Sequence, residues 1–478
     1  MQFVSTTPLA VLMFAGLLWL GPVRGLWILF LSMPMLSASA VNLPGLGSLT
    51  LTDACIMALW LSILGRGVGA ARLFGTAIPS QPGFPLLLLL VFATIGAIFL
   101  PRLFAGQTEV FVLIRTLETG SILLSPLSPT GGNISQLVRL VMAGSVFFLL
   151  ATMFRITGDH VQVYRAMVAA TLLHIVLSVI DIGSYALGLP DLLDVLRTAS
   201  VAMLDNQIVL GIKRLTAGFP EPSSFSYYTI GLYGFWLRYW FGARNSRLSG
   251  LMLLAVLALL VRSTSTSAYI CLLIFTLLFL SWQFAEIARA QRATTLYVVL
   301  TTALPALAGI FVVLYNFVPA IPNLIDQILL SKLQSDSGVE RMNWNLQALV
   351  NFAETYGLGA GIGSVRASSW MSSTLGSLGL IGAAVYVWFV AATLLQRPPV
   401  ALRRSDAAHI VAALQSGCAA ILIQSLITKP YPNLETPFFA MAGLAVGLCR
   451  YLTLKDRSRA TRHAPDHSVV HGQPVTSG

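Results

Sequence analysis

The sequence contains little charge. Only 10% of its 478 residues are Asp, Glu, Lys or Arg, whereas 56% are hydrophobic. Soluble globular proteins carry about 25% charged residues, so this composition excludes a soluble enzyme and a disordered chain. The apolar residues form long runs instead of alternating with polar ones, which excludes a transmembrane β-barrel. A polytopic helical membrane protein is left, and its chemistry must use 18 carboxylates, 29 Lys and Arg and 6 His.

Cysteine and histidine are scarce as well. The 4 cysteines lie singly inside apolar runs and form no Cys-x-x-Cys spacing, so we expect neither a disulfide framework nor a zinc site. No histidine falls in a predicted external loop, which excludes a hydrolase with a Ser-His-Asp triad on that face. The net charge of +11 is typical of the positive-inside rule for membrane proteins, and we expect no nucleic-acid partner.

Apolar runs of membrane length recur along the chain, since a membrane-crossing helix uses about 20 apolar residues. The candidate runs lie at 9–20, 25–40, 51–65, 84–100, 135–154, 166–188, 224–241, 248–261, 268–285, 295–318, 374–395, 408–427 and 437–452. The first two form either a tight hairpin or one span kinked at Pro22, and we expect both to be retained. The sequence therefore predicts an all-α polytopic membrane protein with 12–13 transmembrane helices in one domain, residues 1–452.

The charge of the connections predicts the orientation. The basic set comprises the connections at 65–82, 155–165, 242–248, 286–293 and 396–406 and the tail at 450–478, of which 453–478 follow the membrane domain. The alternate set is nearly balanced. The positive-inside rule places the basic set in the cytoplasm. The C-terminus is then cytoplasmic, and with twelve spans the N-terminus is as well. We expect the tail to be solvated, although its arginines also suit anionic lipids.

Three external loops are long, at 102–134, 189–222 and 319–373. In the last of them, apolar residues recur at helical spacing over 324–333 and again over 346–353, which predicts two short amphipathic helices on the outer face. The glycines at 357–363 then indicate a flexible turn. We therefore expect this loop to be a lid over the membrane domain and not a separate soluble domain.

The end of the second long loop carries the first candidate site residues. Lys213 and Arg214 are suited to bind phosphate, Arg in bidentate fashion, and Glu221 is held between two prolines where a span begins. An ordinary loop entering a helix, with Pro222 in its first turn, explains the same residues. Both interpretations stay open.

The last long loop carries the other candidates. Arg341 follows Glu340 at the start of an amphipathic helix, where a cation opposes the helix dipole, so Arg341 indicates a partner, either Glu340 or an anionic ligand. The glycines before Arg366 could present backbone N–H groups to a phosphate, but a flexible loop has the same composition. Three further glycines within 376–382 share a helix face and favour close helix packing.

Few ionisable residues fall inside the predicted spans, and such residues are functional candidates by default. They are Asp53, Arg139, His174, Asp181 and Arg238. Asp53 and Arg238 lie near span ends, where capping or snorkelling explains them. His174 and Asp181 share a helix face, which allows a proton relay, although a satisfied structural role is the favoured interpretation.

The three external motifs, in this order and on this topology, resemble the bacterial family of O-antigen polymerases (Wzy-like) and O-antigen ligases. The first motif, an Arg followed by Gly-Phe and a Pro-anchored turn into a span, is matched by Arg214, Gly218, Phe219, Glu221 and Pro222. The second, an Arg and a Trp on a helix that ends in a glycine-rich turn, is matched by Arg341, Trp344, Phe352, Gly359, Gly361 and Gly363. In the third, Gly379 and Gly382 match a Gly-x-x-Gly, but the family's His falls on Ser368. That departure favours the polymerases over the ligases.

The resemblance implies a metal-independent membrane glycosyltransferase without a cofactor. A growing glycan leaves an undecaprenyl-diphosphate carrier for a lipid-linked repeat unit on the periplasmic side of the bacterial inner membrane, in exopolysaccharide or O-antigen biosynthesis. The implied catalytic residues are Arg214 and Arg341, which stabilise the diphosphate charge, and Glu221, which activates the acceptor hydroxyl. The implied substrate-binding residues are Lys213, Arg366, Glu340, Ser368 and Trp344.

Three alternatives stay open. An O-antigen-type ligase would transfer the lipid-linked glycan to another acceptor. A transporter or flippase is expected to carry charges in a central cavity and to repeat one half in the other, and neither is evident in the sequence. A purely structural membrane partner in a synthesis complex would not need its arginines. For the polymerase, the implied partners are the lipid-linked oligosaccharide, membrane lipids, and the flippase and chain-length or export proteins of the same pathway.

Overall fold

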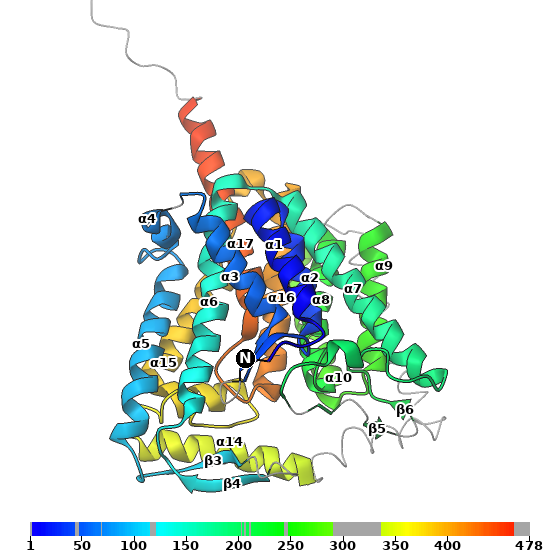
Figure 1. Cartoon of the computed structure of the whole chain (residues 1–478). Helices are drawn as coiled ribbons and strands as arrows, with labels where there is room; N and C mark the ends of the chain where they lie inside the picture. The colour runs from blue at the N-terminus through cyan, green and yellow to red at the C-terminus, as the bar shows by residue number, and fades with distance from the viewer. Residues whose placement is uncertain are drawn as a thin grey trace, which may run out of the picture.

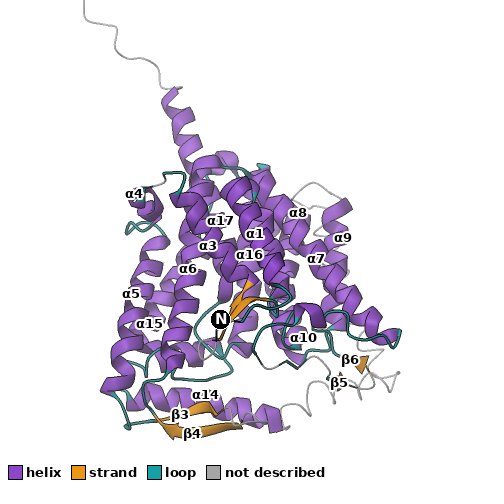
Figure 2. Cartoon of the chain, in the orientation of Figure 1, coloured by secondary structure: helices purple, strands orange, loops and turns teal. Residues whose placement is uncertain are grey.

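The computed structural model describes residues 2–43, 47–67, 69–114, 121–201, 203–204, 207–209, 212–242, 247–289 and 336–462. Within these ranges the chain is a bundle of helices with three short two-stranded sheets (Figure 2). Eight of the described helices are long and apolar enough to cross a membrane. This confirms the predicted all-α, multi-pass membrane protein. The predicted span at 295–318, the amphipathic segment at 324–333 and most of the tail lie outside the described residues.

The bundle consists of long apolar helices and several shorter or more polar ones (Figure 1). The long apolar helices are α1 (Thr7–Arg24), α5 (Gly83–Leu103), α6 (Gly131–Thr157), α7 (His160–Ala186), α10 (Thr266–Arg289), α15 (Trp370–Leu394), α16 (Asp406–Thr428) and α17 (Glu435–Arg462). The others are α2 (Leu26–Ser32), α3 (Leu51–Leu64), α4 (Ala70–Leu73), α8 (Pro222–Gly242), α9 (Arg247–Arg262) and α14 (Asp336–Glu354). Many large apolar side chains on the flanks of these helices are exposed, as expected for a surface that faces lipid.

Small residues allow the central helices to approach closely. A Cβ atom at Gly443 of α17 would lie 2.6 Å from the carbonyl oxygen of Phe147 in α6, and one at Gly234 of α8 would lie 2.7 Å from the Cβ of Ala420 in α16. In lipid, no hydrophobic force drives helices together, because the lipid tails are as apolar as the side chains. Helices therefore associate through such close packing. The helix α8 is buried along most of its length, with Trp236 fully enclosed.

The first two apolar runs form a hairpin. Gly21 adopts a φ of 79°, which interrupts α1 beside Pro22, and the N–H of Gly25 bonds the Gly21 carbonyl at 2.8 Å. The chain therefore turns back into α2, so the hairpin interpretation is correct. Gln2 pairs with Asn42 of the sheet β1 (Ser39–Leu43) and β2 (Gly47–Thr50). The N-terminus consequently lies at the opposite end of the bundle from the end of α17 (Figure 1).

Where the structure describes them, the two predicted sets of connections lie at opposite ends of the bundle (Figure 1). At the end where α17 finishes, Arg155 donates a hydrogen bond to the Arg72 carbonyl at 3.2 Å. At the other end, Asn133 donates to the Ile362 carbonyl at 2.8 Å, and the indole of Trp370 donates to the Pro432 carbonyl at 2.9 Å. We call the latter end, which carries the long loops, the loop end.

The loop end is covered on one side by α14 and a β-hairpin. The hairpin comprises β3 (Glu109–Ile114) and β4 (Ser121–Pro126), and α14 lies across the helix ends above it (Figure 1). Asn351 of α14 donates to the Thr108 hydroxyl at 2.7 Å and to the Glu109 carbonyl at 2.5 Å. The amphipathic helix predicted over 346–353 is therefore present as part of α14.

The glycine run after α14 is tightly packed, which corrects the expectation of a flexible turn. The glycines at 357, 359, 361 and 363 all have φ between 76° and 88°. The N–H of Ala360 bonds the Gly376 carbonyl at 2.7 Å, and that of Gly361 bonds the Ser377 carbonyl at 3.0 Å. These N–H groups are already paired, so they are not available to a phosphate. The glycines instead let the turn pass close to α5 and α15.

Substituting Gly361 tests this packing. Alanine would be strained at its φ of 88°, and its Cβ would lie 2.7 Å from Pro101 Cδ and 2.9 Å from the Gly96 carbonyl oxygen. We expect Gly361→Ala to reduce the free energy of unfolding in detergent by about 2–4 kcal/mol. Gly106→Ala is the matched control, because Gly106 has a φ of 72° with nothing within 4 Å. Equal losses in the two variants would contradict the packing role.

Candidate functional site

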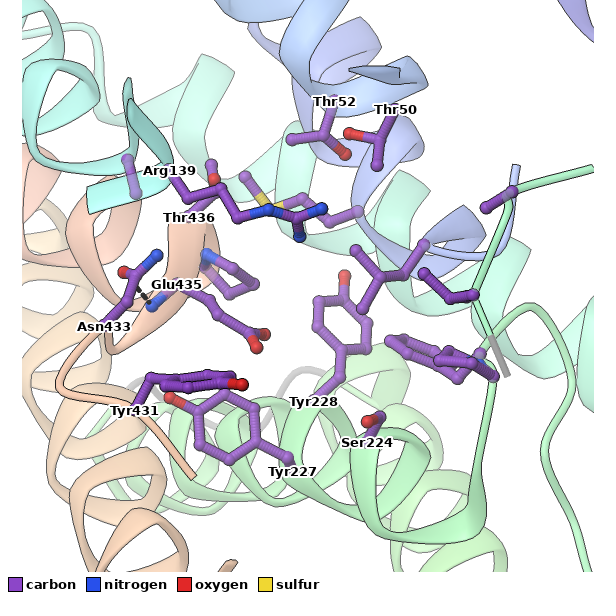
Figure 3. Close-up of a pocket in the computed structure, with 18 of the residues that line it drawn as sticks. Thr50, Thr52, Arg139, Ser224, Tyr227, Tyr228, Tyr431, Asn433, Glu435 and Thr436 are labelled. Carbon is purple, nitrogen blue, oxygen red and sulfur yellow. Dashed lines mark hydrogen bonds between the residues drawn. The ribbon is translucent and has the colours of Figure 1, made fainter. Parts of the chain in front are cut away.

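A cavity of about 370 Å³ opens at the loop end of the bundle (Figure 3). Its wall combines the start of α3, one face of α6, the start of α8 and the segment 429–437 that joins α16 to α17. The polar residues of the wall include Thr50, Thr52, Asp53, Gln136, Arg139, Glu221, Ser224, Tyr227, Tyr228, Lys429, Tyr431, Asn433, Glu435 and Thr436. A concave site with a few convergent polar groups has the general character of a ligand pocket.

Glu221, the predicted base, lies in the wall of this cavity. It directly precedes α8, and its side chain accepts hydrogen bonds from the hydroxyls of Ser223 and, at 3.3 Å, of Ser224. The Glu221 carbonyl also accepts the N–H of Phe225 in the first turn of α8. Glu221 thus helps to start the helix and also presents a carboxylate to the cavity, so the two sequence-based interpretations are compatible.

A second carboxylate in the wall, Glu435, was not identified from the sequence. It forms an ion pair with Lys429, whose Nζ lies 3.9 Å from the centroid of the Tyr227 ring. Such cation–π contacts are favourable when the cation is shielded from water, and Lys429 is only 7% exposed. Glu435 also has a φ of 62°, a conformation that costs non-glycine residues free energy and is concentrated at functional sites.

The segment that carries Glu435 is held in place from several directions. The Tyr227 hydroxyl donates to the Leu434 carbonyl at 2.7 Å, and the Asn433 side chain accepts the N–H of Glu435 at 2.9 Å. Trp370 and the N–H of Ala367 bond carbonyls of the same segment. The signal for this site was present in the sequence, because Glu435 follows a Pro-x-Pro pattern at the start of a span, as Glu221 lies between two prolines at the start of another.

Arg139 and Asp53 complete the ionisable groups of the wall. Asp53 belongs to a capping box with Thr50 at the start of α3, where its carboxylate accepts the Thr50 N–H at 2.9 Å. This supports the capping interpretation of Asp53. Arg139 extends from α6 across the cavity (Figure 3). Among the described residues, no hydrogen bond or ion pair to its side chain is found.

Arg214 is brought within electrostatic reach of Glu221 and of Arg341, which belongs to a motif far away in the sequence. Burial lowers the pKa of Arg214, the charge of Arg341 lowers it further, and Glu221 opposes both effects. Arg214 donates to the Gln207 side chain at 2.6 Å, whereas Arg341 is exposed on the first turns of α14. Neither arginine lines the cavity itself.

Lys213 does not face the cavity but belongs to a buried ion cluster. Its Nζ lies 2.9 Å from Asp181 and 3.1 Å from Asp191, and Arg197 contacts the same two carboxylates. Burial opposes the charge of Lys213, but the hydrogen bonds and charges of Asp181 and Asp191 prevail and raise its pKa. The structure therefore places Lys213 in this ion cluster and outside the cavity wall, and its contact with substrate stays a prediction.

His174 and Asp181 do not contact each other through their side chains. His174 Nε2 lies 2.9 Å from the Thr229 hydroxyl, and its ring stacks on Phe225. Asp181 is held by the ion cluster and by the N–H groups of Thr216 and Ala217. Asp181 is thus satisfied locally, whereas His174 is bonded through Nε2 and its buried Nδ1 has no hydrogen bond among the described residues. The two side chains are not linked to each other, which favours the structural interpretation over a proton relay.

The remaining predicted site residues lie on and beside α14, outside the cavity wall. The Arg366 guanidinium lies 4.6 Å from the centroid of the Trp344 ring. The N–H of Ser368 bonds the Asn345 side chain at 2.8 Å, and Ser368 is buried. Glu340 is exposed at the start of α14. The structure therefore brings Trp344 and Arg366 together, and Glu340 lies one turn before Trp344 on α14.

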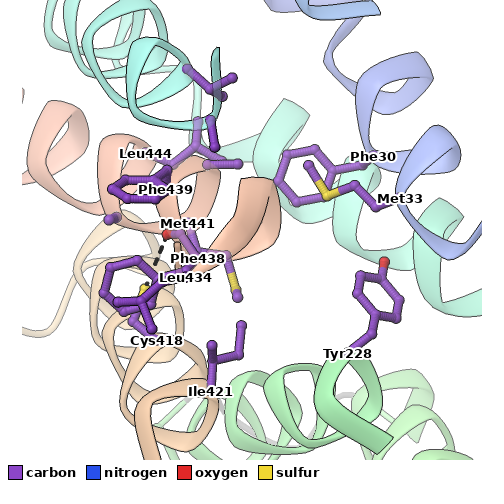
Figure 4. Close-up of a cluster of buried hydrophobic side chains, with 14 of the residues drawn as sticks. Phe30, Met33, Tyr228, Cys418, Ile421, Leu434, Phe438, Phe439, Met441 and Leu444 are labelled. Atoms are coloured by element: carbon purple, nitrogen blue, oxygen red, sulfur yellow. Dashed lines mark hydrogen bonds between the residues drawn. The ribbon is translucent and has the colours of Figure 1, made fainter. Parts of the chain in front are cut away.

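The inner side of the cavity is apolar. Met33, Tyr228 and Pro437 line both the cavity and a small adjoining space whose other walls include Phe30 and Met441. Figure 4 shows these side chains facing the space between α2, α8 and α17. The site thus joins a polar mouth to an apolar interior, an arrangement that suits an amphiphilic ligand. In the described ranges, no three His, Cys, Asp or Glu side chains are grouped to hold a metal ion.

Comparison with known proteins provides no relative from which a function could be transferred. No family model matches the chain, and no curated protein matches it.

Proposed function

We propose that this membrane protein is a polysaccharide polymerase of the bacterial inner membrane, acting in exopolysaccharide or O-antigen biosynthesis. It would transfer a growing glycan from an undecaprenyl-diphosphate carrier to a lipid-linked repeat unit. One observation carries this proposal: Glu221 lines a cavity at the loop end, and Arg214 lies within electrostatic reach of both Glu221 and Arg341. A carboxylate beside two cations is the arrangement that such a transfer requires.

In the proposed reaction, an acceptor hydroxyl attacks the anomeric carbon of the donor glycan. The new glycosidic bond forms as the bond to the diphosphate oxygen breaks, and the hydroxyl proton passes to Glu221 as general base. The diphosphate leaves with the bonding electrons. Arg214 and Arg341 stabilise its developing charge, as preorganised cations do in other group transfers. Trp344 and Arg366, in mutual contact on the same side, are proposed to bind the substrate alongside them.

The orientation of the protein is part of the proposal. The described basic connections and the C-terminal end of α17 lie opposite the loop end of the bundle (Figure 1), and the positive-inside rule assigns that end to the cytoplasm. The cavity would then open to the periplasm. We propose the lipid-linked oligosaccharide, membrane lipids, and the flippase and chain-length or export proteins of the pathway as partners.

One observation favours the polymerase over a ligase. Ser368, which stands where the ligases place a His, is buried beside Asn345 and lines no part of the cavity. A polymerase that uses Glu221 does not need a base at that position.

Substitution of Glu221 tests the proposed base. We expect Glu221→Gln to reduce the rate of polymer formation by about 10²–10⁴-fold, while binding of the lipid-linked donor persists, because the amide cannot accept the hydroxyl proton. Purified protein in proteoliposomes would be assayed with lipid-linked repeat units. Asp456→Asn, at the far end of α17, is the control and should leave the rate unchanged. A normal rate in Glu221→Gln would remove Glu221 as the base.

A further inference from the structure

The cavity wall contains one cation, the exposed Arg139, that forms no ion pair among the described residues. Its ionisable side chains, apart from the tyrosines, are Asp53, Arg139, Glu221, Lys429 and Glu435. Asp53 is paired with Thr50, Glu221 with two serine hydroxyls, and Lys429 with Glu435. Within the described part of the chain, Arg139 has no such partner. A guanidinium offers five N–H donors in a planar fork, a geometry that matches the oxygens of a carboxylate or phosphate.

Helix geometry explains why Arg139 faces the cavity. Gln136, Arg139 and Ala143 are spaced three and four residues apart on α6, so they share one helix face, and all three line the wall. The end of the Arg139 side chain lies over the cavity near Tyr228 (Figure 3).

A second donor at the same place has no partner. The hydroxyl of Tyr228 is buried without a hydrogen bond among the described residues, and Tyr228 as a whole is 4% exposed. In Figure 3 this hydroxyl points toward the Arg139 guanidinium. Contacts with the rings of His174 and Phe219 fix the Tyr228 ring. Buried hydroxyls without a partner are rare, because each costs free energy in the folded protein.

Hydration of Arg139 would explain its missing partner but not that of Tyr228. Both groups donate hydrogen bonds to an acceptor, and an anionic acceptor between them would satisfy both. We propose that Arg139 and Tyr228 bind an oxyanion of the substrate inside the cavity, either a phosphate of the lipid carrier or the carboxylate of an acidic sugar in the glycan. The identity of the molecule that carries the oxyanion rests on the proposed function, whereas the binding of an oxyanion by Arg139 and Tyr228 does not.

Binding to the full-length protein in detergent tests the site directly. Inorganic pyrophosphate, glucuronate and, as the neutral match, glucose would be titrated and followed by ³¹P line broadening or saturation-transfer NMR. We expect pyrophosphate or glucuronate to bind, and Arg139→Gln and Tyr228→Phe each to weaken that binding about 10-fold or more, as for charge-assisted hydrogen bonds. Arg102→Gln is the matched control, since Arg102 is exposed at the same end on α5 and bonds only a carbonyl of its own helix.

The outcomes separate the two sources and the two proposals. Binding of pyrophosphate alone supports the carrier phosphate, and binding of glucuronate but not glucose supports an acidic sugar. Binding of neither anion, or equal binding in wild type, Arg139→Gln and Tyr228→Phe, overturns the site. Should Arg139→Gln fail to fold, Tyr228→Phe, which removes one oxygen atom, decides alone. Anion binding that depends on Arg139, in a protein that forms no polymer, would keep this site and reject the polymerase.

Discussion

Replacing Asp181 with alanine should destabilise the protein by about 3–5 kcal/mol, because it removes one partner of a buried charge network. Asp181 is 1% exposed. One carboxylate oxygen contacts Lys213 and Arg197, and the other accepts the N–H groups of Thr216 at 3.0 Å and Ala217 at 2.8 Å. The variant leaves these cations with less negative charge and both N–H groups without an acceptor.

The loss of Asp181 should also disturb the candidate functional site. Ala217 has a φ of 48°, and the carboxylate holds its N–H just before the segment that leads to Glu221. Unfolding of the purified protein would therefore be compared with polymer formation. Asp194→Ala is the matched control, since the Asp194 side chain contacts the same Arg197 at 3.3 Å but is 70% exposed, and such exposed pairs contribute less than about 1 kcal/mol. Similar losses in both variants would contradict the buried network.

The helices of the bundle could be predicted because apolar runs of membrane length leave few alternatives. The hairpin of α1 and α2 could not be decided, since Pro22 suits a kink as well as a turn; the positive φ of Gly21 settles it. The glycine run was misinterpreted for a related reason. Glycine allows flexibility and close packing alike, and only the neighbouring backbone of α5 and α15 distinguishes them.

The site could be predicted only in part. The sequence indicates Glu221 because it lies between two prolines at the end of a long loop. Glu435 also lies near prolines, but in a short connection that the sequence does not single out. Lys213 was expected to contact phosphate, but the sequence does not show that Asp181 and Asp191 come within 3.1 Å of it. Partners of a charge depend on long-range packing, so a cation that binds a ligand and one in an ion pair look the same in sequence.

Replacing Arg214 or Arg341 with alanine should abolish long polymer without unfolding the protein. Each guanidinium is proposed to stabilise the leaving diphosphate, and loss of one such preorganised donor typically costs about 10²–10³ in rate. Polymer length would be measured at matched membrane expression, with accumulation of lipid-linked repeat units as the second readout. Arg102→Ala, at the same end but outside the site, should leave the polymer unchanged. Undiminished long polymer in either variant would remove that arginine from the site.

Stability distinguishes this role from a structural one. Arg341 is the sixth residue of α14, and its charge adds to burial in lowering the pKa of Arg214. The two cations therefore repel each other in the empty protein, and an anion bound beside them would relieve the repulsion. Arg341→Ala should consequently unfold at the same or a slightly higher temperature than wild type while it loses polymer. If the loss of polymer instead tracked a fall in unfolding temperature, Arg341 would be structural.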